Sequence, residues 1–199
     1  MKVGLLALQG AFLEHRLMFE SIGLTAVEVR LPTQLADIDG LVIPGGESTT
    51  MMKLMDSYDL VTAIRDLSGR GIPIWGTCAG MICLASQAHN PDSSVMQTLA
   101  LMDIVVRRNA FGRQVDSFET PLHINGLPGG PFPGVFIRAP FIEKTGSGVD
   151  VLCRLDNGTI VAARQDNLLV TSFHPELTAD VRLHSYFVSI IKIATRRSA

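Results

Sequence analysis

Residues 72–80 read IPIWGTCAG. The mostly apolar residues 72–75 predict a buried strand and residues 79–86 predict a helix, so Cys78 falls in the tight turn between them. Gly76 and Gly80 suit such a turn, because glycine tolerates close backbone approach and unusual dihedral angles. A strand–turn–helix unit with a reactive side chain in its turn is typical of a nucleophile elbow, here with cysteine in place of serine.

The position of Cys78 favours a reactive thiol. A helix N-terminus stabilises the thiolate, which is the nucleophilic form. The free backbone N–H of Ala79 can donate to a developing oxyanion. The alternative is a buried, inert cysteine, and we expect that packing role for Cys83 and Cys153. The odd cysteine count argues against a disulfide framework and for a reducing compartment, so we expect a cytoplasmic protein.

The first half of the chain alternates strands and helices. Leu13 and Leu17 are spaced four apart on the first predicted helix, and Thr33 is a candidate cap of a short turn at 33–37. This alternation predicts a parallel sheet with helices on both faces and a ligand site beyond the carboxyl ends of the strands. The predicted strands are 3–8, 26–30, 41–43 and 72–75, and the helices are 11–21, 48–67 with a break near Ser57, and 79–86.

The second half has shorter strand-like runs separated by glycine and proline. We expect extra, partly antiparallel strands there, a polar connection at 90–99, a return to the main sheet at 168–173, and a final helix at 179–195. The expected extra strands are 103–107, 114–118, 134–138, 151–155 and 159–163. The expected fold class is α/β: one domain over residues 1–199, a three-layer sandwich with a mostly parallel central sheet.

Composition excludes several functions. Hydrophobic residues make up 47% and charged residues 18% of the 199 residues, which excludes a disordered chain. The net charge of −2 provides no footprint for nucleic acid. No apolar run is long enough to span a membrane, and the Cys and His residues do not recur at metal-ligand spacing. We therefore expect no nucleic-acid partner, no membrane, no metal and no cofactor.

A cysteine nucleophile that acts on an amide needs a base, and His174 is the candidate. It follows the predicted strand 168–173 and precedes Pro175, which favours an extended backbone at His174. Because residues i and i+2 of an extended chain face one side, the carboxylate of Glu176 can hold the imidazole. Cys78, His174 and Glu176 thus form a candidate triad. His15 and His184 lie on predicted helices and receive no role.

The turn Gly45-Gly46-Glu47-Ser48 has two open interpretations. It lacks the spacing and the lysine of a phosphate loop, and Glu47 would repel phosphate. One interpretation is that its backbone N–H groups face a carbonyl oxygen while Glu47 meets a substrate ammonium. The other is a plain tight turn in which Ser48 caps the next helix.

Together these residues resemble the class I glutamine amidotransferases, whose triad is Cys-His-Glu. More narrowly, the chain is similar to the glutaminase subunits of pyridoxal 5′-phosphate synthases. The matching blocks are LQGA (8–11), LVIPGGESTT (41–50), GTCAG (76–80), RNAFGRQVDSFE (108–119), GVFIRAP (134–140) and SFHPELT (172–178).

The resemblance implies roles for particular residues. It makes Cys78 the nucleophile and His174 and Glu176 the rest of the triad. It also implies three further sets: oxyanion-hole donors at Gly46 and Ala79; L-glutamine contacts at Gly46, Glu47, Ser48, Arg108, Ile137 and Arg138; and a partner-facing pair at Gln9 and Gly10.

The resemblance further implies hydrolysis of L-glutamine through a thioester, with ammonia passing to a partner. A single domain leaves no room for an ammonia-using site, so we expect that chemistry on another protein. The implied partner is a (β/α)8-barrel pyridoxal 5′-phosphate synthase subunit in a large hetero-oligomer. The alternatives are a glutaminase serving another synthase, a different hydrolase with the same elbow, and a non-catalytic regulatory subunit.

Overall fold

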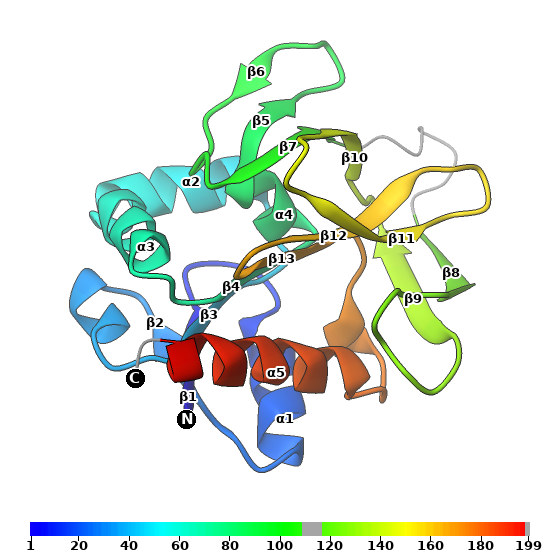
Figure 1. The fold of residues 1–199 in the computed structure, drawn as a ribbon. Coiled ribbons are helices and arrows are strands. Elements are labelled where there is room, and N and C mark those ends of the chain that lie inside the picture. Colours follow the sequence, from blue (N-terminus) through cyan, green and yellow to red (C-terminus); the bar gives the residue numbers. More distant parts are fainter. Residues whose placement is uncertain (109–116, 198–199) are drawn as a thin grey trace.

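The computed structural model describes residues 1–108 and 117–197 (Figure 1). Residues 109–116 of the matching block 108–119 therefore lie outside the described residues, as does most of the predicted strand 114–118. No helix in the described part of the chain is long and apolar enough to cross a membrane.

Five parallel strands form one side of the main sheet, with β2 at its edge. The aliphatic side chains of the other four strands are buried, as expected for strands covered on both faces. Because these strands are parallel, the loops that follow β1, β3, β4 and β13 emerge at one edge. In spatial order they are β2 (Thr25–Val29), β1 (Lys2–Leu6), β3 (Gly40–Ile43), β4 (Ile74–Thr77) and β13 (Leu168–Thr171).

The sheet continues beyond β13 with mostly antiparallel pairings. Three of its strands, β5, β6 and β10, are absent from the sequence expectations, and β6 falls inside the predicted polar connection 90–99. They are short and weakly patterned, and distant pairings hold them, as when β5 lies parallel to β7. The strands are β12 (Ile160–Gln165), β10 (Phe141–Thr145), β7 (Met102–Arg107), β5 (Ala85–His89), β6 (Val95–Met96), and β11 (Asp150–Arg154) paired with β12.

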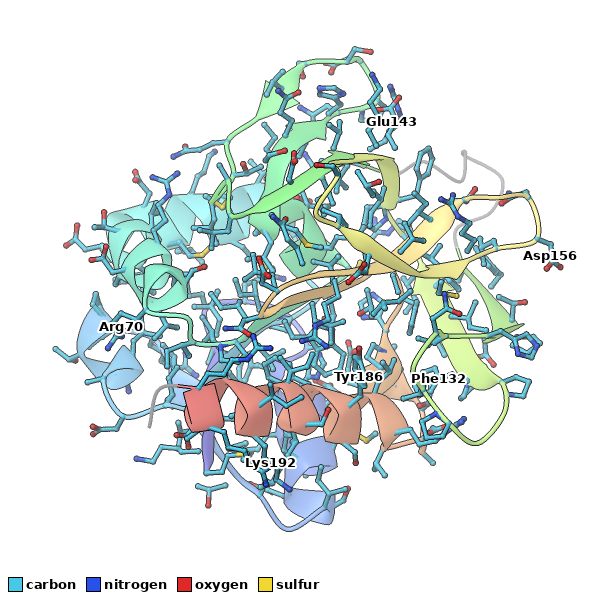
Figure 2. All side chains as sticks on the ribbon, in the orientation of Figure 1. Arg70, Phe132, Glu143, Asp156, Tyr186 and Lys192 are labelled. Carbon is cyan, nitrogen blue, oxygen red and sulfur yellow. The ribbon has the colours of Figure 1, made fainter. Side chains whose placement is uncertain are left out.

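A second, two-stranded antiparallel sheet consists of β8 (Ser117–Leu122) and β9 (Phe132–Ile137). It contacts the N-terminal end of helix α5 (Arg182–Arg197), where Phe132 and Tyr186 belong to the same apolar cluster (Figure 2). The guanidinium of Arg182 also lies 5.8 Å from the centre of the Phe132 ring. The second sheet is thereby attached to the helix that ends the chain.

Helices cover both faces of the main sheet, which confirms the predicted three-layer α/β arrangement (Figure 1). Helices α2 (Ser48–Ser57), α3 (Leu60–Gly69) and α4 (Ala79–Leu84) enclose one apolar cluster. Helices α1 (Phe12–Ser21) and α5 enclose the other. The helix predicted at 179–195 is present as α5, and it buries an apolar face on which Phe187 and Ile191 are fully buried.

The helix predicted from the spacing of Leu13 and Leu17 is present as α1, but these two side chains are 44% and 56% exposed, and α1 buries His15, Met18 and Phe19 instead. One local prediction is wrong. Thr33 does not cap its turn, because it lies inside the 3-10 helix η1 (Pro32–Leu35), whose N-cap is Leu31. There the side chain of Gln34 accepts the backbone N–H groups of Arg30 and Leu31.

Candidate active site

The turn after β4 has the geometry of an elbow. Cys78 has a φ of 46°, a conformation that costs a non-glycine residue energy and persists where its surroundings enforce it. A Cβ on Gly80 would collide with the carbonyl oxygen of Ile43, and one on Gly76 would press on the backbone of Gly80. The two glycines therefore let strand β3, strand β4 and helix α4 meet closely enough to present the Cys78 thiol at the sheet edge.

His174 and Glu176 meet in the segment that follows β13, three and five residues beyond Thr171. The His174 backbone N–H donates to the carbonyl of Val135 at 2.8 Å, which ties this loop to β9. The imidazole Nδ1 lies 2.7 Å from Oε1 of Glu176, so the predicted contact is confirmed. Its predicted cause is wrong: Glu176 lies in the 3-10 helix η2 (Pro175–Leu177), not in extended chain.

The triad residues alter one another's protonation. Burial alone would lower the pKa of His174, but hydrogen bonds to Cys78 and Glu176 raise it to about 10. Burial would raise the pKa of Glu176, yet the nearby His15 and His174 hold it below its ordinary value. These influences favour an imidazolium at His174, held between Cys78 and the Glu176 carboxylate, which is an arrangement that can activate a cysteine nucleophile.

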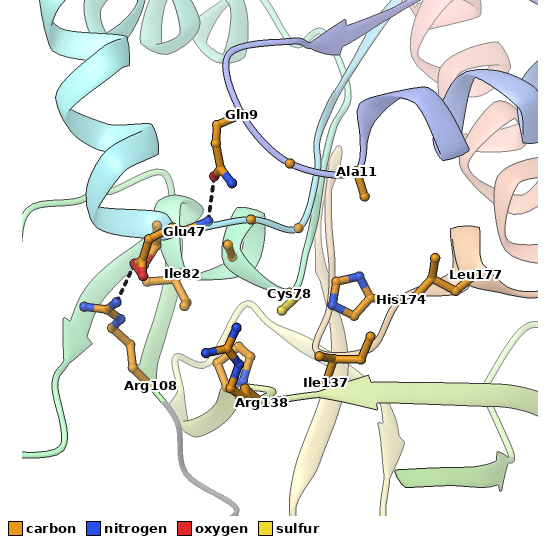
Figure 3. Close-up of a pocket in the computed structure, with 16 residues that line it drawn as sticks. Gln9, Ala11, Glu47, Cys78, Ile82, Arg108, Ile137, Arg138, His174 and Leu177 are labelled. Carbon is orange, nitrogen blue, oxygen red and sulfur yellow. Dashed lines mark hydrogen bonds and ion pairs between the residues drawn. The ribbon is translucent and has the colours of Figure 1, made fainter. Parts of the chain in front are cut away.

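The loop after β3 presents backbone N–H groups toward Cys78. Within residues 1–108 and 117–197, the N–H groups of Gly46 and Ala79 have no hydrogen-bond partner, so both are free for an oxyanion. Gln9 holds this loop, since its Oε1 accepts the Glu47 N–H at 2.7 Å (Figure 3). Gly10, with a φ of 104°, lies too close to the Gly45 carbonyl to carry a side chain.

A cavity of about 480 Å³ opens over Cys78 at this edge. Every candidate residue named from the sequence lines it except Glu176, which lies behind His174. In Figure 3, Ile137 and Arg138 face Cys78 and His174 across the cavity. Sequence reasoning missed the apolar lining residues Ala11, Ile82, Pro140 and Leu177, which carry no local chemical signal.

Arg108 and Glu47 form an ion pair at the mouth of the cavity, with Nη2 and Oε1 2.9 Å apart. Arg108 Nη1 also donates to Asn90 Oδ1 at 2.6 Å. Glu47 is the N-cap of α2 through the N–H of Thr49, so the interpretation of Ser48 as the cap is wrong. A zwitterionic amino acid needs a negative and a positive partner. The carboxylate of Glu47 and the guanidinium groups of Arg108 and Arg138 line the same cavity and can supply them.

A second polar cluster, which sequence reasoning did not find, lies behind the triad. His15 Nε2 is 3.4 Å from Glu176 Oε2 and 3.2 Å from Thr77 Oγ1. His15 Nδ1 is 3.0 Å from His184 Nε2. A signal was present: His184 lies three and four residues before Phe187 and Val188, so helical spacing places it on the same apolar face of the last helix.

The other two thiols differ from Cys78. Burial raises the pKa of Cys83 to about 12 and that of Cys153 to about 11. Neither lines the cavity. Both are therefore protonated and unreactive at neutral pH, in agreement with their expected packing role.

The fold and the comparisons define the class: a glutamine amidotransferase. A solved structure described as a glutamine amidotransferase superposes with a TM-score of 0.89 at 45% identity, covering 96% of this chain and 98% of that one. The chain belongs to the SNO glutamine amidotransferase family, whose model matches residues 5–193.

Curated relatives agree along nearly the whole chain. The pyridoxal 5′-phosphate synthase subunit PdxT of Dehalococcoides mccartyi is 59% identical over 192 residues, 96% of this chain and 98% of that protein. The protein of the same name from Herpetosiphon aurantiacus is 54% identical over 190 residues, 96% of this chain and 100% of that protein.

Proposed function

We propose that this chain is the glutaminase subunit of a pyridoxal 5′-phosphate synthase. In this role it hydrolyses L-glutamine to L-glutamate and ammonia and delivers the ammonia to a synthase subunit. The observation that supports this function best is the arrangement of one cavity. The Cys78 thiol on its strained elbow lies there with two free N–H groups and with His174, which Glu176 contacts from behind. The names of the relatives favour this synthase over another ammonia-dependent enzyme.

The first half of the reaction is acyl transfer to Cys78. The thiolate attacks the side-chain amide carbon of glutamine, and the resulting oxyanion accepts the N–H groups of Gly46 and Ala79. One such donor typically contributes a factor of ~10²–10³ in rate. His174 gives its proton to the amide nitrogen, the C–N bond breaks, and ammonia leaves a thioester on Cys78.

The second half of the reaction releases glutamate. A water gives a proton to His174 and attacks the thioester carbon. The C–S bond breaks, glutamate leaves, and the thiolate–imidazolium pair is restored. Glu176 keeps its charge throughout and orients the imidazole.

We assign glutamine binding to the charged mouth of the cavity. Glu47 suits the substrate ammonium, and Arg108 and Arg138 suit the α-carboxylate. Since Arg108 and Glu47 are paired with each other here, glutamine replaces one ion pair with two.

We further propose that the partner is a (β/α)8-barrel synthase subunit that covers the cavity. Apolar side chains surround this region, with Leu177 and Ile137 lining the cavity while 45% and 37% exposed. Leu13 and Leu17 project from α1, which contacts η2. Such exposed apolar groups are typical of a protein interface.

The test is glutamate release by the full chain with and without the synthase subunit. We expect strong activation by the synthase, and loss of that activation in Leu17→Glu. Ile193→Glu is the matched control, because Ile193 is also exposed, at 43%. It lies far from the cavity: the preceding residue, Lys192, lines a surface pocket with Met1 and Asp39 at the amino-terminal ends of the strands. Equal activity with and without the synthase would contradict the proposed partnership.

A further inference from the structure

The buried cluster behind the triad contains three polar side chains, His15, Thr77 and His184, each with no exposed surface. None of them lines the cavity, so none can touch glutamine. They nevertheless connect helix α1, strand β4 and helix α5 to the back of the catalytic carboxylate.

One carboxylate oxygen of Glu176 contacts His174, and the other faces this cluster. Oε1 lies against His174, whereas Oε2 is fully buried and has no hydrogen-bond partner in the described part of the chain. An unsatisfied buried carboxylate oxygen is costly. In the described part of the chain, the imidazole nitrogen Nε2 of His15 faces Oε2 at 3.4 Å.

The positions of the protons in the two rings follow from their surroundings. Nε2 of His15 faces a carboxylate oxygen and a hydroxyl, so it carries the hydrogen, and Nδ1 accepts. His184 Nε2 must then donate to it, which leaves His184 Nδ1 with a bare lone pair, and that atom indeed has no partner in the described chain. The opposite arrangement would point a lone pair at the carboxylate and bury an unpaired N–H.

Burial lowers the pKa of both rings, to about 2 in His184. Both are therefore neutral at physiological pH, as this arrangement of single protons requires. His184 fixes which nitrogen of His15 carries the hydrogen, and His15 presents that hydrogen to the side of the cluster where Thr77 Oγ1 and Glu176 Oε2 lie.

We propose that His15 is a positioning residue of the triad. Its Nε2–H is hydrogen-bonded to Thr77 Oγ1 and lies 3.4 Å from the second oxygen of Glu176, and its positive end attracts that oxygen and keeps the first oxygen in line with the His174 ring. This inference rests on the proposed glutaminase function. Because α1 begins directly after the Gln9–Ala11 loop, the same segment supports the oxyanion loop and the back of the triad.

The test compares His15→Met, His15→Gln and His15→Asn in the full chain with its synthase subunit. Only the amide nitrogen of glutamine reaches the place of Nε2, whereas that of asparagine replaces Nδ1. We expect kcat for glutamate release to fall about 10- to 100-fold in His15→Met and His15→Asn, since a hydrogen bond to a charged group is worth about that factor. We expect His15→Gln to recover most of it, with KM for glutamine unchanged in all three.

A second readout is the pH dependence of Cys78 alkylation by iodoacetamide. Glu176 faces His174 from its own loop and His15 from α1. Glu14 and His174 also act on His15, and His15 in turn acts on His184. Removing His15 removes the N–H that faces Oε2 at 3.4 Å and favours the charged carboxylate, so Glu176 takes up a proton at higher pH. The acid limb of alkylation should therefore move to higher pH in His15→Met and stay in place in His15→Gln.

Met18→Ala is the stability control, because Met18 is buried on the same helix and does not line the cavity. It should lower Tm and leave kcat unchanged. If His15→Met does not fold, the Gln and Asn variants at matched Tm decide the question. Equal kcat in those two, or a rise in KM with wild-type kcat, would overturn the proposal. Absence of glutamate release by the wild-type complex would instead refute the proposed function.

Discussion

Gly80 and Ile43 are in backbone contact: the Cα of the glycine faces the Ile43 carbonyl oxygen so closely that no Cβ fits between them. Through this contact the end of β3 fixes the first turn of α4. The oxyanion loop after β3 and the thiol after β4 therefore keep one relative position.

Replacing Gly80 with alanine should prevent this contact. Since the obstructing atom is backbone, the strand must move, and we expect a loss of stability of at least about 1–3 kcal/mol together with loss of glutaminase activity. Gly69→Ala is the control: nothing lies near its added Cβ at the end of α3, and Tm should stay equal or rise. Thermal unfolding of both variants checks the prediction, which a Gly80→Ala variant with wild-type Tm and activity would disprove.

Only one of the three thiols should matter for activity. Cys78→Ala should reduce glutamate release by at least about 10³-fold, because the remaining site has no nucleophile. Cys83→Ala, five residues further along the same segment, should keep kcat while losing some stability, since Cys83 is fully buried. Mass spectrometry after iodoacetamide treatment of the native chain should find the label on Cys78 alone, and labelling of Cys83 would contradict this assignment.

Arg108 should govern glutamine affinity. Arg108→Met removes the guanidinium that pairs with Glu47, and we expect KM for glutamine to rise about 10- to 100-fold with a smaller change in kcat. The neighbouring Arg107 pairs with Glu143, 3.0 Å away, and does not line the cavity. Arg107→Met should therefore behave as wild type in steady-state kinetics, and a similar KM in both variants would refute the role of Arg108.

The buried His184 should make the fold acid-sensitive. In the unfolded chain it takes up a proton below about pH 6.5, whereas its pKa in the folded chain is lowered to about 2. The stability it contributes is thus present above pH 6.5 and is lost as the pH falls, by about 1.4 kcal/mol per pH unit. Urea unfolding between pH 7.5 and 5 should show a shallower pH dependence in His184→Phe, and no such change in the exposed His123→Phe.

Much of the site could be predicted because it follows local rules. The elbow around Cys78 needs only a strand, two glycines and a helix, all adjacent in sequence. The position of His174 follows from the buried strand before it. Its contact with Glu176 was predicted correctly from spacing, although a 3-10 turn and not an extended chain brings the two together.

The remaining features depend on distant parts of the chain. His15 and His184 are 169 residues apart in sequence, and the pairing of two helices under one sheet brings them into contact. Strand β5 is held by β7, and the hairpin that it forms with β6 places Asn90 against Arg108. On α1 the residues at helical spacing with the greatest hydrophobicity, Leu13 and Leu17, are those left exposed, because a histidine takes the buried position.

Two non-glycine residues of the cavity, Cys78 and Arg138, have positive φ angles of 46° and 42°. Such residues typically cost of order 1–3 kcal/mol each, and glycine would relieve the cost. Arg138→Gly should therefore raise the melting temperature of the protein and lower its turnover of substrate. For thermostability engineering, these two positions are where gains in melting temperature and in turnover are expected to oppose each other.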